Sequence, residues 1–592
     1  MVVRKDIGLE AIGTMAELPP DHSPLQIGAR GTCRDKRFKL LGRLRVRWED
    51  GAWDEWYADF GGNSYGWVAE TQGFFMISEA APAQPALADA IKQLGAGQPV
   101  NLGGTEYRVS DIKQATAAGG EGELPFVAVP GETWQDTDLT GPGRAFAGVE
   151  WHEGEAQFFM GFSAMPDEVQ WEGLKAVPGW NGEPVPVEKK MTQAMSCPNC
   201  GGVVEVRLAG VTTTLACSHC GSLIDVHKSR AEIGQKVLKA ESLPQPPLAL
   251  GKRGTLRGVE WEVLGCLWRK DPYVTWRELL LYNPWQGFAW LTESAGHWNF
   301  IKRIPDTPVG SGYDMRFGDK AYRLFDAQDT EVTQVAGEFY WRVRVGEKTS
   351  VADYIAPPYV LSSELYPELQ ELTWSTGEYV PADVIGGAFG QVLRSGDGVY
   401  LNAPNPWIER RGAFVKMGVV AVVVAIVLEA LFSSFSHRRT VLDQNLIVQQ
   451  PGVESAPSVS QTFELKGRRR ADIDLKSDSN TALPNLTASL VGESTGTAYP
   501  VPVAVNPAQG SNNTMVGTSL PAVPAGKYHL TLSPLPSGTL PTEPVHVKIE
   551  QGGLFTSNFV ICLLALLSWP AWAVYRYHRF EADRWSQSDY TP

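Results

Sequence analysis

Two long apolar runs place the strongest limit on how this chain folds. They cover residues 413–435 and residues 554–575. A helix needs about 20 apolar residues to cross about 30 Å of hydrocarbon, and a backbone in lipid must satisfy its own hydrogen bonds. Each run therefore predicts a transmembrane helix, with a buried helix of a soluble domain as the alternative for the first. Basic residues on both sides of the first run favour a span: Arg410, Arg411, Arg438 and Arg439.

The basic residues also predict an orientation. Arg576, Arg579 and Arg584 follow the second run, whereas only Lys548 closely precedes it, which favours a cytoplasmic C-terminus. Two spans put both termini on the same side, and the first ten residues lack the apolar stretch of a signal peptide. We therefore expect residues 1–412 and 576–592 in the cytoplasm, the spans in a bacterial inner membrane, and residues 436–553 outside.

One acid, Glu429, lies inside the first apolar run. An ionisable side chain at membrane depth is a functional hypothesis by default. The alternative is that Glu429 snorkels to the interface or pairs with Arg438.

An internal repeat organises residues 1–407. At an offset of 223 residues, a first set matches the stretch from Gly251 to Glu278 without a gap: Gly28, Arg30, Gly31, Thr32, Arg34, Leu41, Gly42, Leu44, Trp53 and Glu55. The same offset relates Trp151, Gly154 and Glu155 to Trp374, Gly377 and Glu378, and an offset of 215 relates Tyr107-Arg108 to Tyr322-Arg323 between them. These identities predict two copies of a domain of about 140 residues.

Both copies show the patterns of short strands. Phe38–Trp48 and Trp261–Trp268 alternate apolar and polar residues between turn signals, and Pro82–Leu94 predicts a short helix between two β subdomains. Short strands with many glycines favour small curved sheets or barrels. Tryptophans at paired positions are interpreted as core residues: Trp53, Trp151, Trp276 and Trp374.

Three tryptophans are extra to the second copy, namely Trp285, Trp290 and Trp298. They are candidates for an aromatic groove that takes a ligand or a partner, with core packing as the alternative.

The repeats resemble an uncharacterised bacterial family known as domain of unknown function 4178. The resemblance is carried by the Gly-x-Arg-Gly-Thr turn, the Leu-Gly-x-Leu strand and a downstream Trp-x-Glu, each present twice. It covers less than half of the chain. It implies association with zinc ribbons, membrane segments and membrane-stress systems. The family has no agreed catalytic residues, so none is transferred to this chain.

Four cysteines between the repeats carry the clearest chemical motif. Cys197-Pro-Asn-Cys200 and Cys217-Ser-His-Cys220 are separated by sixteen residues. Four thiolates at this spacing predict a tetrahedral structural zinc site, with two redox pairs as the alternative. Val203–Leu208 and Thr212–Ala216 predict the two strands of one hairpin between the pairs. Four protein ligands leave no open position on the metal, so a catalytic role is not expected.

Residues 436–553 contain no Trp and no Cys and are rich in Ser, Thr, Pro and Val. Segments such as Ala471–Leu475, Tyr528–Leu532 and Val545–Ile549 alternate apolar and polar residues as strands do. We expect a β-sandwich of seven or eight strands.

Charge and motifs narrow the function classes. The net charge is −14, with −15 on residues 1–407, so nucleic acid is not an expected partner. The sequence contains no Gly-x-Ser-x-Gly elbow, no His-Glu-x-x-His and no phosphate loop, so no catalytic residue is assigned.

We expect a non-enzymatic membrane-anchored scaffold or sensor that recruits cytoplasmic or membrane proteins in a membrane-stress system, with homo-oligomers left open. The alternative is that the repeats bind a small ligand or carry an enzymatic activity; a deep pocket with convergent polar groups would favour it.

The expected fold class is a mainly β multidomain membrane protein with two barrel-like repeats. Its expected segments are an N-terminal segment 1–25, repeat 26–180, linker 181–196, zinc ribbon 197–226, linker 227–249, repeat 250–405, transmembrane helix 413–435, extracytoplasmic β-sandwich 436–553, transmembrane helix 554–575 and cytoplasmic tail 576–592.

Overall fold

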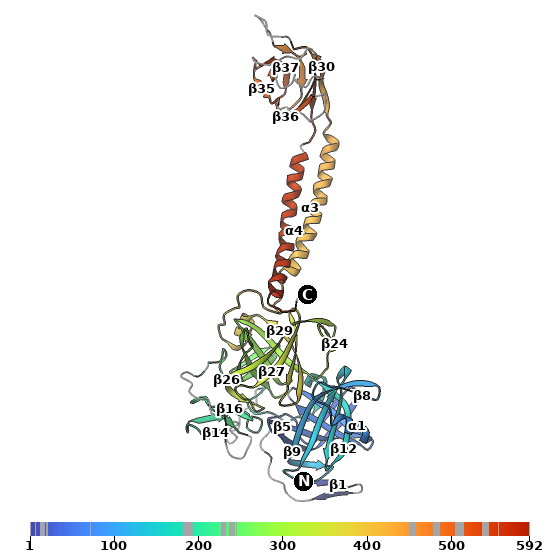
Figure 1. Ribbon diagram of the computed structural model, residues 1–592, viewed down its shortest axis with the longest axis vertical. Helices are drawn as coiled ribbons and strands as arrows, with labels where there is room; N and C mark the ends of the chain where they lie inside the picture. The colour runs from blue at the N-terminus through green and yellow to red at the C-terminus, as the bar shows by residue number, and fades with distance from the viewer. Residues whose placement is uncertain are drawn as a thin grey trace. The chain divides into compact units, whose positions relative to one another are not determined.

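The computed structural model describes residues 2–5, 8–11, 18, 22–71, 73–181, 193–226, 232–235, 243, 245–448, 457–477, 486–503, 514–535, 544–554 and 556–590. The chain divides into two compact units, one of residues 1–405 with 579–592 and one of residues 406–578. Strands dominate the first unit, and the second contains two long helices and two small sheets (Figure 1).

The first repeat closes into an eight-stranded antiparallel barrel. Its strands are β4 (Lys36–Trp48), β5 (Gly51–Gly61), β6 (Ser64–Thr71), β7 (Phe74–Ala81), β9 (Thr105–Leu124), β10 (Thr133–Thr140), β11 (Ala145–His152) and β12 (Glu155–Ala164). Neighbours pair in the order β4-β5-β6-β7-β12-β11-β10-β9, and β9 returns to β4. The two four-stranded meanders therefore join at both edges and close the ring.

The second repeat closes in the same order. Its strands are β20 (Val259–Lys270), β21 (Thr275–Asn283), β22 (Gly287–Ser294), β23 (His297–Ile304), β26 (Lys320–Phe339), β27 (Lys348–Ala356), β28 (Tyr359–Tyr366) and β29 (Glu371–Val380). They pair as β20-β21-β22-β23-β29-β28-β27-β26, and β26 returns to β20. The prediction of β-rich, barrel-like repeats is confirmed.

Strand pairing corrects the end of the predicted repeat. Strands β4 to β7 match β20 to β23 at an offset near 223, and β9 and β10 match β26 and β27 at 215. Trp151 lies on β11 but Trp374 lies on β29, whose counterpart is β12, so the predicted equivalence of these tryptophans is wrong. A three-residue identity carries no register information, whereas the hydrogen-bonded pairing does.

The eight-residue difference between the copies falls in the connection that follows the first meander. Ala81 and Thr105 are 24 residues apart, whereas Ile304 and Lys320 are 16 residues apart. Helix α1 (Pro85–Ile91) occupies the longer connection and confirms the predicted helix. It joins the two halves of one barrel rather than two subdomains.

A glycine in each barrel permits a close crossing of two strands. The pairing of β4 with β5 shifts register at Gly42, and that of β20 with β21 shifts at Gly265. A Cβ on Gly42 would lie 1.9 Å from the carbonyl oxygen of Glu123, and one on Gly265 would lie 2.7 Å from that of Glu338. The Leu-Gly-x-Leu motif of the repeat therefore marks a β-bulge at which only glycine fits.

Apolar layers cover the outer faces of both barrels. Strands β3 (Arg30–Cys33) and β13 (Gln170–Glu172) pair beside the first barrel, and Trp56 is buried in its outer core. Strand β19 (Arg253–Leu256) and helix α2 (Ala382–Phe389) cover the second, where Trp261, Trp298 and Phe389 share a core. Apart from the cysteine-rich segment, the other elements of this unit are β1 (Val2–Lys5), β2 (Gly8–Ala11), β8 (Pro99–Leu102), β24 (Val309–Ser311), β25 (Asp314–Phe317) and the short turns η1 (Pro142–Arg144) and η2 (Pro166–Glu168).

The cysteine-rich segment forms two short hairpins. Strand β14 (Gln193–Ser196) pairs with β15 (Val203–Val206), and β16 (Thr214–Ala216) pairs with β17 (Leu223–Asp225). The predicted single hairpin between the cysteine pairs is wrong, because each of its strands pairs across its own cysteine turn instead. Strand β18 (Glu232–Gln235) extends β17, and β16 also pairs with β26 of the second barrel.

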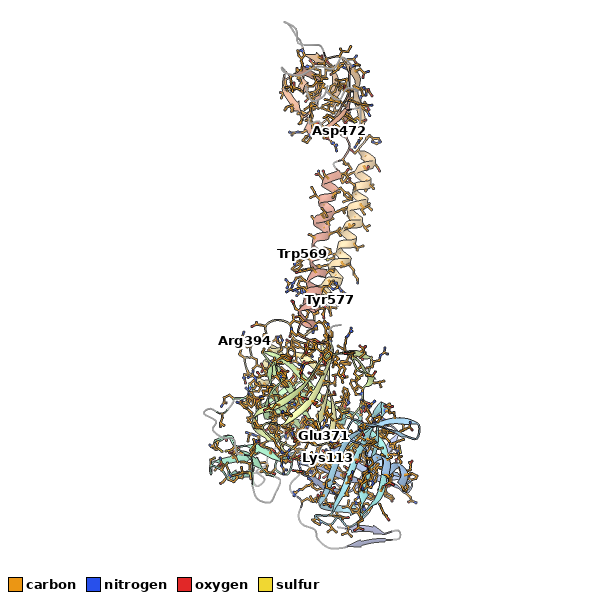
Figure 2. The ribbon with its side chains drawn as sticks, viewed as in Figure 1. Lys113, Glu371, Arg394, Asp472, Trp569 and Tyr577 are labelled. Atoms are coloured by element: carbon orange, nitrogen blue, oxygen red, sulfur yellow. The ribbon has the colours of Figure 1, made fainter. Side chains whose placement is uncertain are left out.

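In the second unit, the helices α3 (Trp407–Phe435) and α4 (Thr556–Trp585) run side by side (Figure 1). The rings of Trp407 and Trp572 meet edge to face at 4.9 Å, and Gly418 faces Pro570, whose Cγ would lie 2.5 Å from an added Cβ. Trp569 lies on the same part of α4 (Figure 2). Both helices are long and apolar enough to cross a membrane by length and composition.

Two antiparallel sheets share one apolar core in the rest of this unit. One contains β30 (Arg439–Leu446), β33 (Arg469–Ser477), β36 (Thr514–Val523) and β38 (Val545–Gln551), and the other contains β31 (Ser458–Val459), β32 (Phe463–Leu465), β34 (Leu486–Gly492), β35 (Ala498–Val501) and β37 (Gly526–Pro534). Ile473 and Leu490 are fully buried between the sheets. The described residues thus hold nine strands rather than seven or eight, and the named alternating segments are all strands.

We expect Gly42→Ala to destabilise the protein by about 1–3 kcal/mol, because the new methyl group would lie 1.9 Å from the oxygen of Glu123. Thermal unfolding of the full-length chain in detergent measures the change as a lower Tm. Gly387→Ala is the control, because a Cβ there meets no atom within 4 Å and alanine favours its helix. An equal loss of Tm in both variants would contradict the interpretation.

Candidate functional site

The second barrel is hollow. Its interior cavity has a volume of about 540 Å³ and is lined by inward-facing side chains from all eight strands. Aromatic rings form part of the wall, including Trp276, Trp290 and Trp341. Polar side chains form much of the rest, among them Asn299, Ser362 and Thr373. The cavity therefore combines apolar surface with convergent hydrogen-bonding groups, as small-molecule sites do.

Acidic side chains dominate the charge of this cavity. Eight aspartates and glutamates line it, against two arginines. Arg269 is 3% exposed and lies 3.4 Å from Glu278 and 3.5 Å from Glu364, and Arg303 donates to Glu371 at 2.9 Å. The two arginines thus pair with three of the eight acids and leave five acids of the wall without an arginine of the wall as partner.

Two of the remaining acids face each other across a strand pair. Asp326 on β26 lies directly opposite Asp353 on β27, next to a shift in register between Leu324 and Asp326. Burial raises the pKa of Asp353 to about 7, the charge of Asp326 acts in the same direction, and a hydrogen bond from Ser362 opposes it. Burial also raises the pKa of Asp326. Like charges opposite each other destabilise a sheet, and β-bulges commonly aim side chains at functional sites.

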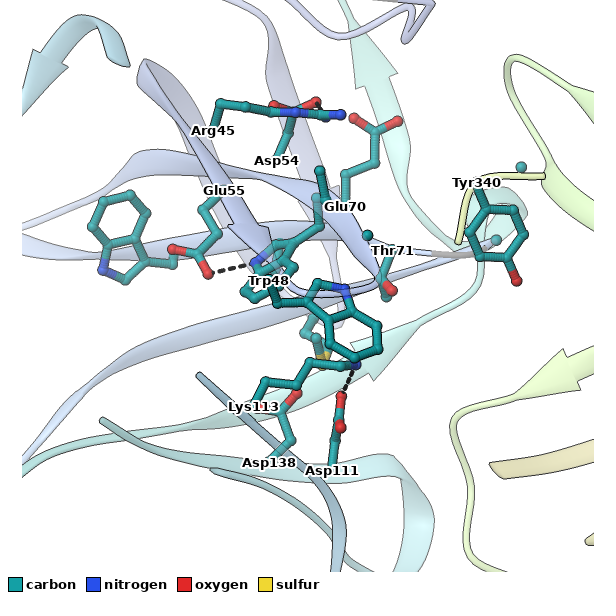
Figure 3. A pocket seen from close by; sticks show the side chains of 18 of the residues that line it. Arg45, Trp48, Asp54, Glu55, Glu70, Thr71, Asp111, Lys113, Asp138 and Tyr340 are labelled. Carbon is teal, nitrogen blue, oxygen red and sulfur yellow. Dashed lines mark hydrogen bonds and ion pairs between the residues drawn. The ribbon is translucent and has the colours of Figure 1, made fainter. Parts of the chain in front are cut away.

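The first barrel contains a smaller cavity of about 190 Å³ with the same kind of wall, which Tyr340 and Trp341 of the second repeat also line (Figure 3). Asp111 on β9 lies directly opposite Asp138 on β10, again beside a bulge. Burial and neighbouring acids raise the pKa of Asp138 to about 8. Burial and the charge of Glu150 raise the pKa of Glu55 to about 8, while an N–H from Trp53 donates to Glu55 at 2.8 Å.

The two cavities hold matching residues at matching strand positions. The barrels share one tryptophan and four acids, paired as Trp53 with Trp276, Glu55 with Glu278, Asp111 with Asp326, Asp138 with Asp353, and Glu150 with Glu364. In the second barrel the Trp276 N–H donates a hydrogen bond to Glu278 at 2.7 Å, as the Trp53 N–H does to Glu55 in the first. Each member lines the cavity of its own barrel.

An ion-pair network joins the two barrels at their cavities. Lys113 of β9 pairs with Asp111 and lies 3.8 Å from Glu371 of β29, which also pairs with Arg303 (Figure 2). Burial opposes the ionisation of Glu371, but the charges of Lys113 and Arg303 outweigh it and lower the pKa. The side chain of Trp48 lines both cavities and lies under the Lys113 ammonium, 4.3 Å from ring centre to nitrogen.

The end of the chain forms part of the second cavity's wall. Arg584 is fully buried and donates to the carbonyl oxygen of Leu401 at 2.6 Å, and Gln587 donates to that of Val399 at 2.8 Å. Gln587, Val399 and Leu401 all line the cavity. The segment that leads into α3 is therefore bound at this wall to the last turn of α4 and to a residue just after it.

The four ribbon cysteines gather at one point. Their sulfur atoms all lie within 4.8 Å of one another, and the Cys197–Cys220 and Cys200–Cys217 pairs are each 3.8 Å apart. A tetrahedral ion with sulfur ligands at about 2.3 Å requires sulfur separations of about 3.8 Å, so the set fits a metal ion. Gly201 and Gly221 close the two turns by donating to the carbonyl oxygens of Cys197 and Cys217, both at 2.8 Å.

The structure separates the other residues that the sequence singled out. Trp290 lines the second cavity, Trp298 is buried in the outer core with α2, and Trp285 lines a small hollow between the barrels. Trp285 and Trp290 both pack against one apolar cluster of the second repeat. Glu429 lies on α3 and forms no ion pair with any described residue; Arg438 lies 3.9 Å from Glu550 instead.

Sequence reasoning missed the barrel acids. Trp53 and Trp276, which the sequence predicts as core residues, line the cavities and donate hydrogen bonds to the glutamates two positions later. Trp53 also packs against the apolar cluster of Leu44 and Val46, as predicted. A signal was present, because Asp111 and Asp138 match Asp326 and Asp353 at the offset of 215. Identities between the copies at polar positions were the pattern that could have found the site.

We expect Glu55→Gln to stabilise the folded chain above neutral pH. The pKa of Glu55 is about 8 when folded against an ordinary value of 4.5, so the folded state binds more protons between these values and loses stability as pH rises through them. Glutamine still accepts the Trp53 hydrogen bond and carries no charge. The gain in Tm over wild type should therefore grow from about pH 4.5 to pH 8.

Melting curves of the full-length chain at several pH values measure this difference. Glu132→Gln is the control, because Glu132 is an exposed glutamate of the same barrel. A constant difference between Glu55→Gln and wild type across the range would argue against the buried, acid-rich interior.

Comparisons with known proteins give a family match and no informative structural relative. No curated protein matches. An arabinoxylan arabinofuranohydrolase of glycoside hydrolase family 43 from Bacillus subtilis, in complex with cellotetraose, is 9% identical with a TM-score of 0.12, and the match covers 82% of this chain and 95% of that one. Trypanosoma rangeli sialidase is 8% identical with a TM-score of 0.10 over 96% and 97% of the two chains. These scores are too low to carry an argument about fold.

The family model described as domain of unknown function (DUF4178) matches residues 26–164 and 249–382. The two regions end at or just after β12 and β29 and are consistent with two copies of one barrel domain.

Proposed function

We propose that this protein is a membrane-anchored sensor whose second barrel binds a small polar ligand. The main evidence for ligand binding is the cavity of about 540 Å³, which is lined by convergent polar and aromatic side chains. Closed eight-stranded barrels either fill their interior with side chains or hold one small ligand, and small-molecule sites have volumes of about 300–1,000 Å³. A filled interior would have favoured a pure scaffold; the hollow one favours binding.

The attachment of the cavity wall supports a sensing role. Arg584 and Gln587, beyond the second apolar run, bind the carbonyl groups of the residues that lead into the first. A ligand that moves Val399 or Leu401 therefore acts on both helices through short covalent connections. For ligand binding to change the spacing or rotation of the two helices, this part of the cavity wall must have two arrangements, and the ligand must bind one of them more tightly.

The membrane placement in this proposal follows from charge and length. The helices α3 and α4 cross a bacterial inner membrane, the barrels and the tail are cytoplasmic, and the two-sheet domain is an extracytoplasmic β-sandwich. The arginines after the second apolar run support this orientation. A reducing cytoplasm also suits the free ribbon cysteines.

Ser362→Phe tests the binding site, because Ser362 faces the cavity and phenylalanine would fill part of it. Ser363→Phe is the matched control on the same strand, since successive strand residues point to opposite faces. Full-length protein is purified from native membranes, and small molecules released by heat are identified by mass spectrometry. We expect one small molecule near one equivalent in wild type and Ser363→Phe, and its loss in Ser362→Phe.

Two results would remove the proposal. One is an identical small-molecule content in all three proteins. The other is a wild-type protein that retains no small molecule and shows no thermal stabilisation by any compound in a metabolite screen.

The cysteine ribbon in this proposal holds a structural zinc ion and offers a surface for protein recruitment. Four thiolates and no open ligand position suit zinc. Strands β14 and β15 form a separate two-stranded sheet, and Val203 on β15 is 62% exposed. Unpaired strand edges beside an exposed apolar residue favour contact with another protein.

Elemental analysis of the full-length chain should find one zinc per chain in wild type and none in Cys217→Ser, because three ligands bind zinc far more weakly than four. Cys562→Ser is the control, since Cys562 lies on α4 outside the ribbon. Another metal, or an equal zinc content in Cys217→Ser, would contradict the assignment.

The same preparations also test recruitment by the ribbon. A stoichiometric partner protein that is present with Cys562→Ser and absent with Cys217→Ser would support recruitment by the ribbon. Retention of the partner by both variants would contradict it.

A further inference from the structure

We propose that the ligand of the second barrel is an organic cation that carries ammonium or guanidinium groups. This inference rests on the proposed ligand-binding function and adds the chemical class of the ligand. It comes from the acids that both barrels share, from the two side chains with which the protein already neutralises some of them, and from the arrangement of the acids that remain.

The acids are retained where the copies otherwise differ. Four carboxylates lie on four different strands of each barrel, at positions that pairing makes equivalent. Their neighbours on the inner face change: Asp136 of the first barrel corresponds to Val351, and Val46 corresponds to Arg269. Buried carboxylates destabilise a barrel unless they are neutralised, so their retention in both copies points to a shared use rather than to packing.

The first barrel shows how an ammonium group fits this constellation. The Lys113 ammonium pairs with Asp111 and lies over the ring of Trp48. Carboxylate contact and an aromatic face are the two features that protein sites use to bind ammonium ions. At the equivalent position the second barrel has Gln328, which carries no charge and lines the larger cavity.

The second barrel neutralises a different part of its wall. The guanidinium of Arg269 forms ion pairs with Glu278 and Glu364 and donates a hydrogen bond to the Thr330 hydroxyl at 2.6 Å. Among the described residues, no lysine or arginine forms an ion pair with Asp326 or Asp353, although they lie directly opposite each other. A positive group between them would remove their mutual repulsion.

A buried hydroxyl in the same cavity offers a further polar group to a ligand. Thr349 lines the same cavity and is 1% exposed, and its hydroxyl has no hydrogen-bond partner among the residues that the structure describes. Thr349 is on β27 together with Asp353 and points to the same face. A buried hydroxyl without a partner is unfavourable, so a ligand with a polar group there satisfies it.

The spacing of the acids argues for an organic cation over a metal ion. Within the described part of the chain, the four cysteines are the single group of three or more His, Cys, Asp or Glu residues whose ligand atoms lie within 4.8 Å of one another. The barrel carboxylates are therefore too dispersed to surround one metal ion. A molecule with separated N–H groups can reach acids on different strands while its carbon chain contacts Trp276 and Trp290.

The test uses three six-carbon probes that differ in charge: 1,6-diaminohexane, 1,6-hexanediol and adipate, with Ca²⁺ as the metal probe. Calorimetry on the full-length chain in nanodiscs should detect binding of the diamine and of none of the others. Asp353→Asn and Asp326→Asn should each weaken diamine binding at least about tenfold, because each removes a charged hydrogen-bond partner. Asp329→Asn, an exposed acid of the same strand, should leave the affinity unchanged.

Two exchanges between the barrels sharpen the test. Gln328→Lys introduces the lysine of the first barrel into the second, so it should raise the Tm and abolish diamine binding. Lys113→Gln should open the first cavity and give a second equivalent of bound diamine, provided that its Tm shows a folded chain.

The outcomes separate this inference from the proposed function. Binding of hexanediol, adipate or Ca²⁺ at least as tight as that of the diamine overturns the cation and leaves the cavity as a site. Diamine binding that survives Gln328→Lys places the cation elsewhere and also overturns the inference. If no probe binds, the cation class is rejected, and the comparison of Ser362→Phe with Ser363→Phe decides separately whether the cavity binds anything.

Discussion

The barrels of this protein place carboxylates on their inward faces, and the neutralisation of those carboxylates shapes the molecule around them. A small closed barrel usually fills its interior with apolar side chains. Here apolar layers that contain Trp56, Trp261 and Phe389 cover the outer faces. Inside the first barrel, the carboxylates share the interior with an apolar cluster that includes Leu44 and Val46. An unpaired buried charge costs several kcal/mol, so each cation inside the barrels stabilises the fold by pairing with buried carboxylates. The ammonium of Lys113 is notable because it serves acids of both barrels and thereby fixes their contact.

One long strand connects the cavity with the ribbon. Strand β26 contributes Asp326 to the cavity near its beginning and Glu338 to the ribbon at its end. The buried carboxylate of Glu338 accepts hydrogen bonds from the backbone N–H of Arg207 at 2.8 Å and from the hydroxyl of Thr212 at 2.8 Å. Burial raises the pKa of Glu338, and these donors act against that rise. Strand β26 therefore contacts both the cavity and the segment that links the two ribbon hairpins.

The sequence predicted the elements of this fold better than their closure. Apolar runs and alternating patterns located both long helices and the strands of the two-sheet domain, because these depend on local periodicity. The CxxC spacing located the cysteine cluster, because ligand geometry is also local. Barrel closure depends on the pairing of β4 with β9, whose partners are 69 positions apart at Arg47 and Thr116 and 80 apart at Gly42 and Gly122. No local pattern encodes that pairing. The site followed from the closure: Asp111 and Asp138 look like surface acids until the pairing of β9 with β10 turns both inward.

The place of Arg584 in the chain has a consequence for how the protein is made. Chains are synthesised from the N-terminus, and domains generally fold as they emerge. Both barrels and the ribbon are complete in sequence by residue 405, but the wall of the second cavity also needs Gln587, which follows both long helices. The strands can close early, whereas the cavity gains its full wall only after the last helix has been synthesised and has brought its end back to the barrel. Chains that stop before Gln587 thus carry an unfinished pocket, and a finished pocket requires that both long helices have been synthesised.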